Sequence, residues 1–531
     1  MTDELTIAAI LRRAEQFSPH RAIVSREPDR SLYRTTWTEI GVRSRRLASA
    51  LLGLGLVRGA RVATLCWSHR QHLELCFAAP LAGFALHPLN PRLHVDDIAY
   101  IATHAGDDVL VIDEGFLPLY EQLRDSTRFR HVVVIGAARA GALAYEDLLV
   151  HGDPGWKPPL LDERSTALIG FTSGTTGRPK GVEVSHRAVA LHSLSSALPG
   201  WLGIRDSDVL LPVVPMYHAL AWGWPYTAAL LGAGLVLPGP FLDPESLLEL
   251  FVSEQVTLTG GVPTIWMGVL RVLDTDPARH DLSAMRAILS GGSTAPPSMI
   301  TGYAERHGVE LVHTWGMTEL MMGAIAQLSV DLLDAAPDTQ LRHRLTQGRP
   351  MPFLEIRART DVGFAAWDGR TLGELEIRGP WVATEYLNSP EASVDQWTDD
   401  SWFRTGDIVT ITSGGYVEIA DRAKDVVKSG GEWISTPVIE GALMAHPAVA
   451  EAAVIGVTDD HWGERPLAVV VFHPGSTATS DELREFIAPH MARWWLPERI
   501  EFVPALPRTA VGKFDKVALR RAFPSTIGAD S

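Results

Sequence analysis

The sequence predicts an α/β fold with a largely parallel sheet in its N-terminal part, followed by smaller β-rich units and a compact α+β tail. Short apolar runs alternate with helical patterns such as Val42–Leu56. The runs that we expect to form buried strands are Arg61–Leu65, Val109–Ile112, His131–Ile135 and Val209–Val214. This alternation is typical of parallel sheets whose faces are covered by helices.

The C-terminal part follows a different pattern. Two runs alternate between polar and apolar residues like half-exposed strands, and a helical run then precedes another strand. These segments are Glu374–Arg378, Tyr416–Ile419, Thr436–Met444 and Val449–Val457. Because the charge density also rises here, we place a domain boundary at residues 421–424.

The composition is that of a folded, acidic chain with several packed units. Its 531 residues exceed one ordinary core, since domains average about 150 residues. The formal net charge of -16 argues against a protein that coats nucleic acid or an anionic membrane. Cys66 and Cys76 cannot form a disulfide framework, and Met1–Gln16 lacks a signal-peptide pattern, so we expect a cytoplasmic protein.

One apolar run, Ala219–Leu237, is long enough to cross a bilayer. It contains Pro225 and several glycines, and no Lys or Arg occurs between Arg205 and Arg271 to anchor a span. We therefore expect a buried segment of a globular domain and no membrane span.

The sharpest local feature is a loop rich in glycine and hydroxyl residues, Thr172–Gly181, directly after the strand-like run Thr166–Phe171. Such a loop can direct backbone N–H groups, hydroxyls and one ammonium at phosphate oxygens, which predicts an ATP site. It differs from the Walker loop because Pro179 and Gly181 flank Lys180. Kinase and P-loop ATPase functions therefore lose support.

Further motifs follow the loop in order: Trp315–Glu319, Trp402–Asp407, Asp421–Asp425, Lys428–Ser435, Pro507–Lys513 and Gly512–Lys516. With the loop, this set resembles the adenylate-forming superfamily over nearly the whole chain, and is most similar to medium- and long-chain fatty acyl-CoA synthetases. The resemblance implies an N-terminal adenylation domain at 1–420, built of two α/β subdomains and a small β-barrel. It further implies a hinge at 421–424 that pivots at Lys424, and a small mobile α+β domain at 425–531.

The resemblance also implies an ATP site with Mg²⁺. The residues implied to bind the nucleotide are Thr172, Ser173, Gly174, Thr175, Thr176, Gly177, Gly292, Ser293, Thr294, Trp315, Gly316, Met317, Thr318, Asp407 and Arg422. Trp315 would stack on the adenine, and Asp407 would accept hydrogen bonds from the ribose hydroxyls. Glu319 and Thr176 would position Mg²⁺, a hard cation that favours oxygen ligands.

By the same resemblance, the residues with catalytic roles are Lys513, Lys180, Glu319, His218 and Lys428. The negative charge of a carboxylate repels the α-phosphate that it must attack, and Lys513 would neutralise that approach. The C-terminal domain would then rotate to withdraw Lys513 and admit coenzyme A. The residues implied to face coenzyme A are Gly430, Gly431, Glu432 and Trp433.

The acid substrate is expected to be apolar. The residues implied to bind the acyl group are Trp222, Gly223, Gly261, Val262 and Met317, with Trp222 in the place of a gating tryptophan. Between Pro215 and Pro240 there is no Asp, Glu, Lys or Arg, so the ammonium of an amino acid would be buried unpaired. No carrier domain follows Lys513, so we expect free coenzyme A as the acceptor.

We therefore expect an acyl-CoA synthetase, an acid–thiol ligase that makes an acyl-adenylate with ATP and then the thioester. Trp315 stands where relatives have tyrosine, Leu220 where they have asparagine, and Leu320–Met321 where they have small hydroxyl residues. These differences leave open a ligase that mainly handles a preformed adenylate. A nucleotide-binding protein without turnover is the alternative from another class. The identity of the acid, and whether the protein is a homodimer, are left open by the sequence.

Overall fold

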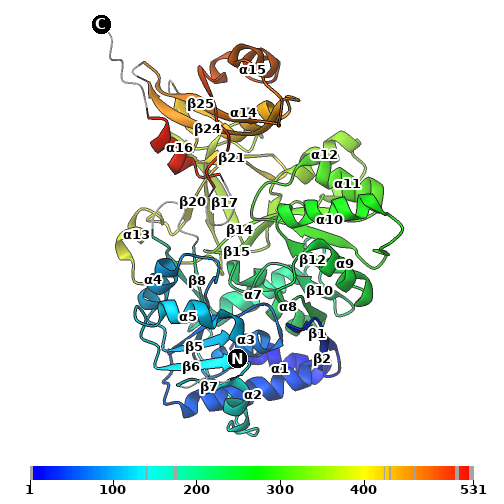
Figure 1. The fold of residues 1–531 in the computed structure, drawn as a ribbon, viewed down its shortest axis with the longest axis vertical. Coiled ribbons are helices and arrows are strands. Elements are labelled where there is room, and N and C mark those ends of the chain that lie inside the picture. The colour runs from blue at the N-terminus through cyan, green and yellow to red at the C-terminus, as the bar shows by residue number, and fades with distance from the viewer. Residues whose placement is uncertain are drawn as a thin grey trace. The chain divides into compact units, whose positions relative to one another are not determined.

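The computed structural model describes residues 4–137, 141–172, 178–423, 425–429, 432–459, 461–508 and 514–524, without the side chains of Ala219 and Glu432. The chain divides into two compact units (Figure 1). The first unit contains Met1–Thr172, Arg178–Glu355 and Arg378–Phe403, and the second contains Ile356–Ile377 and Arg404–Ser531.

One sheet of the first unit is parallel except at its edges. From edge to edge its strands are β16 (Arg349–Pro350), β15 (Met321–Ile325), β14 (Glu310–Met317), β13 (Ala287–Ser290), β12 (Leu258–Gly261), β10 (Val209–Pro212), β11 (Gly234–Leu237), β1 (Ala22–Arg26) and β2 (Leu32–Thr36). The helices that accompany it are α7 (His186–Ala197), α8 (Trp224–Leu231), α9 (Pro244–Ser253), α10 (Pro263–Thr275), α11 (Pro297–His307) and α12 (Pro337–Leu345). The pairs from β14 to β1 are parallel, whereas β15, β16 and β2 pair antiparallel with their neighbours.

The other sheet of the first unit is also mainly parallel. Its strands, in order, are β7 (Leu143–Ala144), β6 (His131–Ile135), β5 (Val109–Asp113), β3 (Arg61–Leu65), β4 (Ala85–Pro88), β8 (Thr166–Phe171) and β9 (Gly181–Ser185). The helices of this region are α1 (Ile7–Phe17), α2 (Trp37–Gly53), α3 (Arg70–Leu81), α4 (Val95–Ala105), α5 (Leu117–Leu123) and α6 (Tyr145–Val150). Helix α2 starts earlier than the predicted Val42, because the Thr36 side chain caps it by accepting from the Glu39 N–H.

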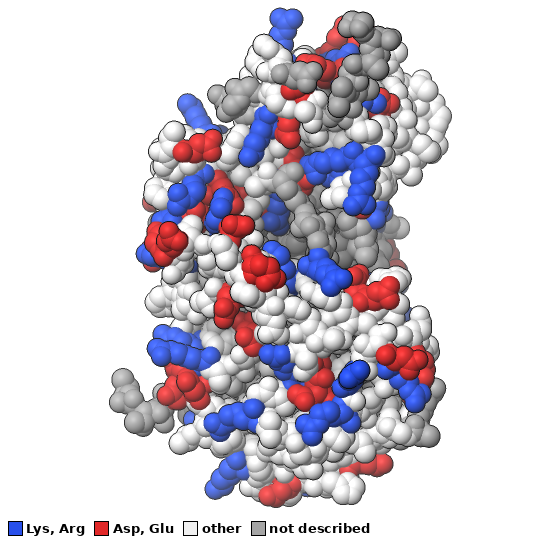
Figure 2. Space-filling model, turned by 90° about the vertical axis from the view of Figure 1, so that its left-hand side faces the viewer, with Lys and Arg blue, Asp and Glu red and all other residues white. Residues whose placement is uncertain are grey.

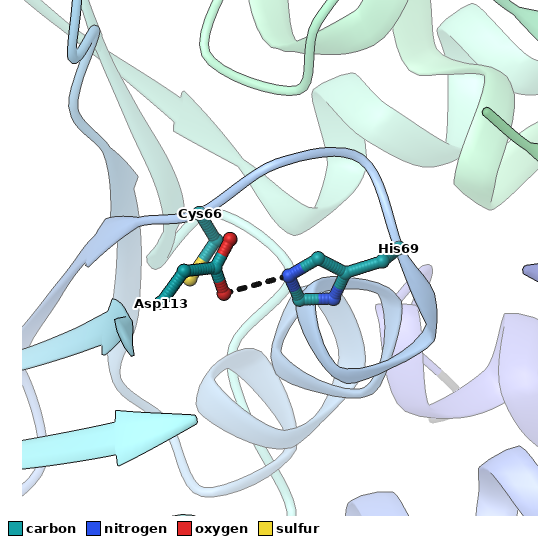
Figure 3. A group of neighbouring side chains, drawn as sticks. All are labelled: Cys66, His69 and Asp113. Carbon is teal, nitrogen blue, oxygen red and sulfur yellow. Dashed lines mark hydrogen bonds and ion pairs between the residues drawn. The ribbon is translucent and has the colours of Figure 1, made fainter. Parts of the chain in front are cut away.

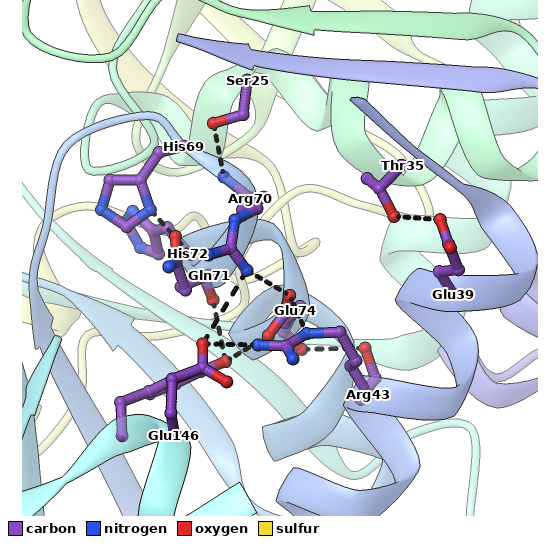
Figure 4. Close-up of polar contacts among 12 residues, drawn as sticks. Ser25, Thr35, Glu39, Arg43, His69, Arg70, Gln71, His72, Glu74 and Glu146 are labelled. Atoms are coloured by element: carbon purple, nitrogen blue, oxygen red, sulfur yellow. Dashed lines mark hydrogen bonds and ion pairs between the residues drawn. The ribbon is translucent and has the colours of Figure 1, made fainter. Parts of the chain in front are cut away.

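An ion network around the buried Glu74 joins α2, α3 and α6 (Figure 4). Arg43 lies 2.7 Å from Glu74 and 2.7 Å from Glu146, and the Tyr145 hydroxyl donates to Glu74 at 2.6 Å. The Glu74 side chain is only 1% exposed. A buried carboxylate is tolerated only when it is paired and hydrogen-bonded, so the network fixes how these helices pack.

The apolar run Ala219–Leu237 folds into short elements: a 3-10 turn at Ala219–Gly223 (η2), then α8, then β11. In the described ranges, no helix is long and apolar enough to cross a membrane. Strand β11 lies between β10 and β1 inside its sheet, which explains why the run is so apolar.

The second unit contains two smaller sheets. The first has the order β18 (Gly363–Phe364), β17 (Glu355–Thr360), β19 (Gly373–Arg378), β20 (Phe403–Ile411) and β21 (Val417–Arg422). The second has the order β23 (Glu432–Ile434), β22 (Val427–Ser429), β25 (Gly463–Phe472) and β24 (Val449–Asp459), with β26 (Arg499–Phe502) paired to β25. Its helices are α14 (Thr436–Met444), α15 (Ser480–Ile487) and α16 (Lys516–Ala522). The helix predicted at 436–444 and the strand predicted from Val449 are confirmed.

Candidate active site

The structure brings Glu319 and Lys180 together around a residue that the sequence did not single out, Tyr386. The Tyr386 hydroxyl donates to Glu319 Oε1 at 2.7 Å, and Lys180 Nζ lies 4.6 Å from the centre of the Tyr386 ring. Glu319 is only 4% exposed. Burial, reinforced by the Glu319 charge, raises the pKa of the Tyr386 phenol, so the tyrosine remains a hydrogen-bond donor.

The two ends of the phosphate loop are joined to each other. The Thr172 N–H donates to the Lys180 carbonyl at 3.0 Å, and the Lys180 N–H donates to Thr172 Oγ1 at 3.0 Å. These bonds extend the antiparallel pairing of β8 with β9, so the loop leaves and re-enters the sheet at neighbouring points. The predicted loop residues Ser173, Gly174, Thr175, Thr176 and Gly177 lie outside the described residues.

Trp315 is accommodated by a glycine on the neighbouring strand. A Cβ atom on Gly323 would lie 2.6 Å from the Trp315 ring and 2.7 Å from Leu320. Gly316 is equally constrained, since a Cβ there would lie 2.0 Å from the Met321 carbonyl oxygen. The Trp315 ring therefore fits because β15 has no side chain at Gly323.

The remaining nucleotide residues of this unit follow β13 and β14. Gly292 has a φ of 84°, a left-handed conformation that favours glycine, and a Cβ there would lie 3.4 Å from Val262. Ser293 and Thr294 follow it and are exposed. At the end of β14, the Thr318 methyl lies 3.3 Å from the Cβ position of Gly170 on β8. Met317 precedes it, half-buried.

Trp222 stands on a strained turn. Leu220, Ala221 and Trp222 have φ values of 46°, 52° and 54°, and Gly223 follows at 72°. Each non-glycine residue in this left-handed region costs about 1–2 kcal/mol. The Trp222 ring lies against two glycines. A Cβ atom added to Gly260 would lie 2.8 Å from the ring, and one added to Gly291 would lie 3.1 Å from it.

Three of the predicted acyl residues, Trp222, Gly261 and Val262, therefore lie at the carboxyl ends of β12 and β13. The Gly291 N–H donates to the Gly261 carbonyl at 3.0 Å, which joins the two strand ends beside Trp222, and Val262 is the next residue along. A small apolar cavity adjoins the strained turn. Its lining includes Cys76, Met216, Leu220, Ala221 and Tyr226.

Two histidines flank the same turn. His218 directly precedes it, and its ring lies 4.9 Å from that of Tyr217. His192 is buried, and its Nδ1 would lie 2.7 Å from a Cβ on Gly223. Neither ring nitrogen of His192 has a hydrogen-bond partner in the described part of the chain, and burial lowers its pKa to about 4. The imidazole is therefore neutral at physiological pH.

The second unit holds its own group of predicted residues. Asp407 on β20 and Arg422 on β21 are direct cross-strand partners, and Arg422 Nε lies 2.9 Å from Asp407 Oδ1. Arg422 also donates to the Thr405 carbonyl at 3.2 Å. The Asp407 side chain is 2% exposed, so Arg422 stabilises its negative charge.

Lys428 and Trp433 are likewise cross-strand partners, on β22 and β23, with Lys428 Nζ 5.8 Å from the tryptophan ring. Lys424, Gly430, Gly431 and Lys513 lie outside the described residues, as does the side chain of Glu432. The roles predicted for them stay predictions.

A separate cluster of Cys66, His69 and Asp113 has side chains that could hold a metal ion (Figure 3). The hydrogen bonds of these three residues indicate a structural role instead of a metal site. Asp113 accepts from the Trp67 N–H at 2.8 Å and lies 2.7 Å from His69 Nε2, while His69 Nδ1 caps α3. Burial raises the pKa of the Cys66 thiol well above its usual value, which disfavours the thiolate that a metal requires. We therefore interpret the cluster as the anchor of the loop after β3.

On the face of the molecule shown in Figure 2, basic and acidic side chains are interspersed. On that face, the residues described do not form a continuous basic surface. This distribution accords with the net charge of -16 and with binding of anionic ligands at local cationic positions.

Comparison with known proteins identifies the family. The model of AMP-binding enzymes matches residues 10–387, and that of the AMP-binding enzyme C-terminal domain matches 438–513. A medium-chain-fatty-acid–CoA ligase of Ectopseudomonas oleovorans is 40% identical over 98% of this chain and 97% of its own. A long-chain-fatty-acid–CoA ligase of Thermus thermophilus is 43% identical over 99% of this chain and 97% of its own. The ATP-bound structure of MatB from Rhodopseudomonas palustris has a TM-score of 0.82 at 25% identity, covering 97% of this chain and 99% of that one.

The chain therefore belongs to the family of AMP-binding enzymes, as an AMP-forming acid–thiol ligase. Its reaction has two steps: a carboxylic acid and ATP form an acyl-adenylate, and coenzyme A then displaces AMP to form the thioester. The predicted fold class, family and reaction are thereby confirmed.

Proposed function

We propose that this enzyme activates a medium- to long-chain or bulky apolar acid. The carrying observation is the acyl side of the site, where the Trp222 indole lies on Gly260 and Gly291. Within 215–240 there is no charged residue that could pair with a polar substituent of the acid. The names of the fatty-acid ligases at 40% and 43% identity support the same substrate class.

We propose that the phosphate loop and Lys180 bind the β- and γ-phosphates of ATP. Glu319 and Thr176 would hold Mg²⁺, and their carboxylate and hydroxyl oxygens suit this hard cation, which neutralises phosphate charge when bound. Tyr386 joins this group because its hydroxyl fixes the orientation of the Glu319 carboxylate. Asp407, oriented by Arg422, would bind the ribose hydroxyls.

We propose that the two steps use different positions of the C-terminal domain. In the first, Lys513 neutralises the approach of the acid carboxylate, whose oxygen bonds to the α-phosphorus as pyrophosphate leaves. Rotation at Lys424 then presents Lys428 and Trp433 to coenzyme A. The sulfur of coenzyme A, after losing its proton, bonds to the acyl carbon, and AMP leaves with the oxygen that joined them.

A cytoplasmic location remains part of the proposal. Cys66 and Cys76 are both free and buried, which suits a reducing compartment.

A panel of acids tests the substrate class. AMP release would be measured for straight-chain acids of increasing length, branched acids and free amino acids, each with and without coenzyme A. We expect AMP release coupled to acyl-CoA formation with the longer apolar acids. Preference for an amino acid or a short polar acid would overturn the proposal.

A further inference from the structure

A buried polar cluster ties the predicted hinge to the start of α14. Asp421 Oδ2 accepts from the Thr436 N–H at 2.7 Å and from the Thr436 hydroxyl at 2.7 Å. The Ser435 hydroxyl donates to the Ala420 carbonyl. Asp421 therefore satisfies an otherwise unpaired N–H in the first turn of the helix, where a negative charge is favourable.

Helix α16 completes the cluster through Lys516. Its ammonium donates to Thr436 Oγ1 at 2.6 Å and lies 2.8 Å from Glu440, which also accepts from the Val454 N–H at 2.8 Å. The Thr436 hydroxyl thus receives one hydrogen bond from Lys516 and gives one to Asp421. Such chains strengthen each bond within them.

The cluster is buried, and this makes its members depend on one another. Thr436 is fully buried and Asp421 is 4% exposed. Burial raises the pKa of both carboxyl groups, Asp421 and Glu440, and the Lys516 charge opposes this shift. Two carboxylates share one ammonium, so removing Lys516 leaves two buried negative charges without their counter-charge.

The contacts lie on opposite sides of Lys424 in the sequence. Ala420 and Asp421 precede it, whereas Ser435, Thr436 and Lys516 follow it. A rotation of the backbone at Lys424 must separate these partners. The contact is therefore specific for one domain arrangement.

A neighbouring ion pair provides a matched contrast. Arg520, one turn further along α16, lies 2.9 Å from Asp425. Both residues follow Lys424, so they would move together and stay paired in either arrangement. The contact of Asp421 with Thr436 thus crosses the predicted pivot, whereas the ion pair of Arg520 with Asp425 does not.

We propose that Asp421, Thr436 and Lys516 form a latch that holds one of the two domain arrangements, with Lys516 as its positioning residue. The proposal rests on the proposed function, in which the two half-reactions use different arrangements. Lys516 lies three residues after Lys513 in the sequence. The helix that closes the latch therefore also adjoins the segment that carries the adenylating lysine.

The first test compares half-reactions in latch variants. Pyrophosphate exchange into ATP and thioester formation from supplied acyl-adenylate would be measured for Lys516→Met, Asp421→Asn and the control Arg520→Met. We expect both latch variants to change the ratio of the two rates at least about tenfold and in the same direction, with Arg520→Met within about twofold of wild type. Lys516→Arg should restore the ratio. An unchanged ratio in folded latch variants, or an equal change in Arg520→Met, would overturn the latch.

The second test locks the latch covalently. Asp421→Cys and Thr436→Cys place thiols at two side chains that are in hydrogen-bond contact, while Cys66 and Cys76 are buried. Oxidation of the double variant should suppress one half-reaction at least about tenfold and spare the other, with reductant restoring the lost step. Equal rates in a protein shown to be cross-linked would contradict the proposal.

Wild-type rates separate this inference from the proposed function. If the wild-type enzyme performs both half-reactions and the latch variants leave their ratio unchanged, only the latch fails. If the wild-type enzyme performs neither step with any apolar acid, the proposed function itself fails.

Discussion

The Tyr386 hydroxyl lies 2.7 Å from the Glu319 carboxylate, and the same tyrosine ring lies 4.6 Å from the Lys180 ammonium. One side chain therefore contacts both a proposed metal ligand and a proposed phosphate ligand. A cation over an aromatic face is attracted to it, so the ring also helps to position Lys180.

We predict that Tyr386→Phe impairs adenylation and raises the Mg²⁺ concentration that it requires. The change removes a hydrogen bond to a charged group, worth about 1.5–3 kcal/mol, so kcat/KM for ATP should fall roughly ten- to a hundredfold. Pyrophosphate exchange at graded Mg²⁺ concentrations measures this.

Tyr303→Phe is the matched control for that variant. The Tyr303 hydroxyl, on α11, is also buried and donates to the carbonyl of Trp266, on α10, at 2.7 Å. The Tyr303→Phe variant should lose about as much thermal stability as Tyr386→Phe, while its adenylation keeps the Mg²⁺ dependence of the wild type. Equal loss of exchange in both variants would show that Tyr386 has a merely structural role.

Acyl selectivity should change when the support of Trp222 is altered. A Cβ on Gly260 would lie 2.8 Å from the Trp222 ring, so Gly260→Ala should displace the indole and change the preferred acid length. Trp222→Ala should shift activity toward longer or wider acids. KM for ATP should change little in either variant.

The double variant Gly260→Ala/Trp222→Ala should resemble Trp222→Ala alone, since the added methyl no longer meets an indole at position 222. Gly53→Ala is the control, because a Cβ there has nothing within 4 Å. If the acid profile of Trp222→Ala equals that of wild type, Trp222 is ordinary core.

Lys513→Ala should abolish adenylation and spare thioester formation from supplied acyl-adenylate, because only the first step opposes two negative charges. Removal of one preorganised charge donor costs about 3–4 kcal/mol, or a few hundredfold in rate. The exposed Lys157 offers a control, as Lys157→Ala should leave both rates near wild type. Equal loss of both steps in Lys513→Ala would defeat the assignment.

Stability should decline on mild acidification because of three buried neutral histidines, His72, His186 and His192. Burial lowers the pKa of each to about 4. As the pH falls from the unfolded value near 6.5 toward about 4, only the unfolded chain binds these protons, so stability falls.

The free energy of unfolding should fall by at most about 1.4 kcal/mol per pH unit for each histidine. No such loss of stability is expected above about pH 7. Urea unfolding at a series of pH values measures it. His192→Gln should remove the contribution of one histidine from the pH dependence of the free energy of unfolding. A stability that is constant between pH 7 and 5 would contradict this account.

The sequence predicted the architecture where local periodicity and burial agree. The strand at Arg61–Leu65 and the helix at Thr436–Met444 have the predicted bounds, because apolar side chains at regular spacing decide both. The resemblance assigned Asp407 and Arg422 to the nucleotide, but their pairing across β20 and β21 was not predicted.

Other features depend on tertiary contacts that leave no local signal. Tyr386 lies 67 residues from Glu319 in sequence, and no motif joins them. The left-handed turn at Leu220–Trp222 contains no glycine, the usual sign of positive φ, so surrounding packing must hold it. The start of α2 was missed because Thr36, its cap, lies before the apolar pattern begins.

Exchange of labelled pyrophosphate into ATP, measured without coenzyme A, tests the central claim most directly. We predict exchange that requires an apolar acid and Mg²⁺, and acyl-CoA release once coenzyme A is added. If no acid supports exchange but supplied acyl-adenylate still yields acyl-CoA, the enzyme handles only preformed adenylates. If neither reaction occurs, the chain binds nucleotide without turnover, and the account is contradicted.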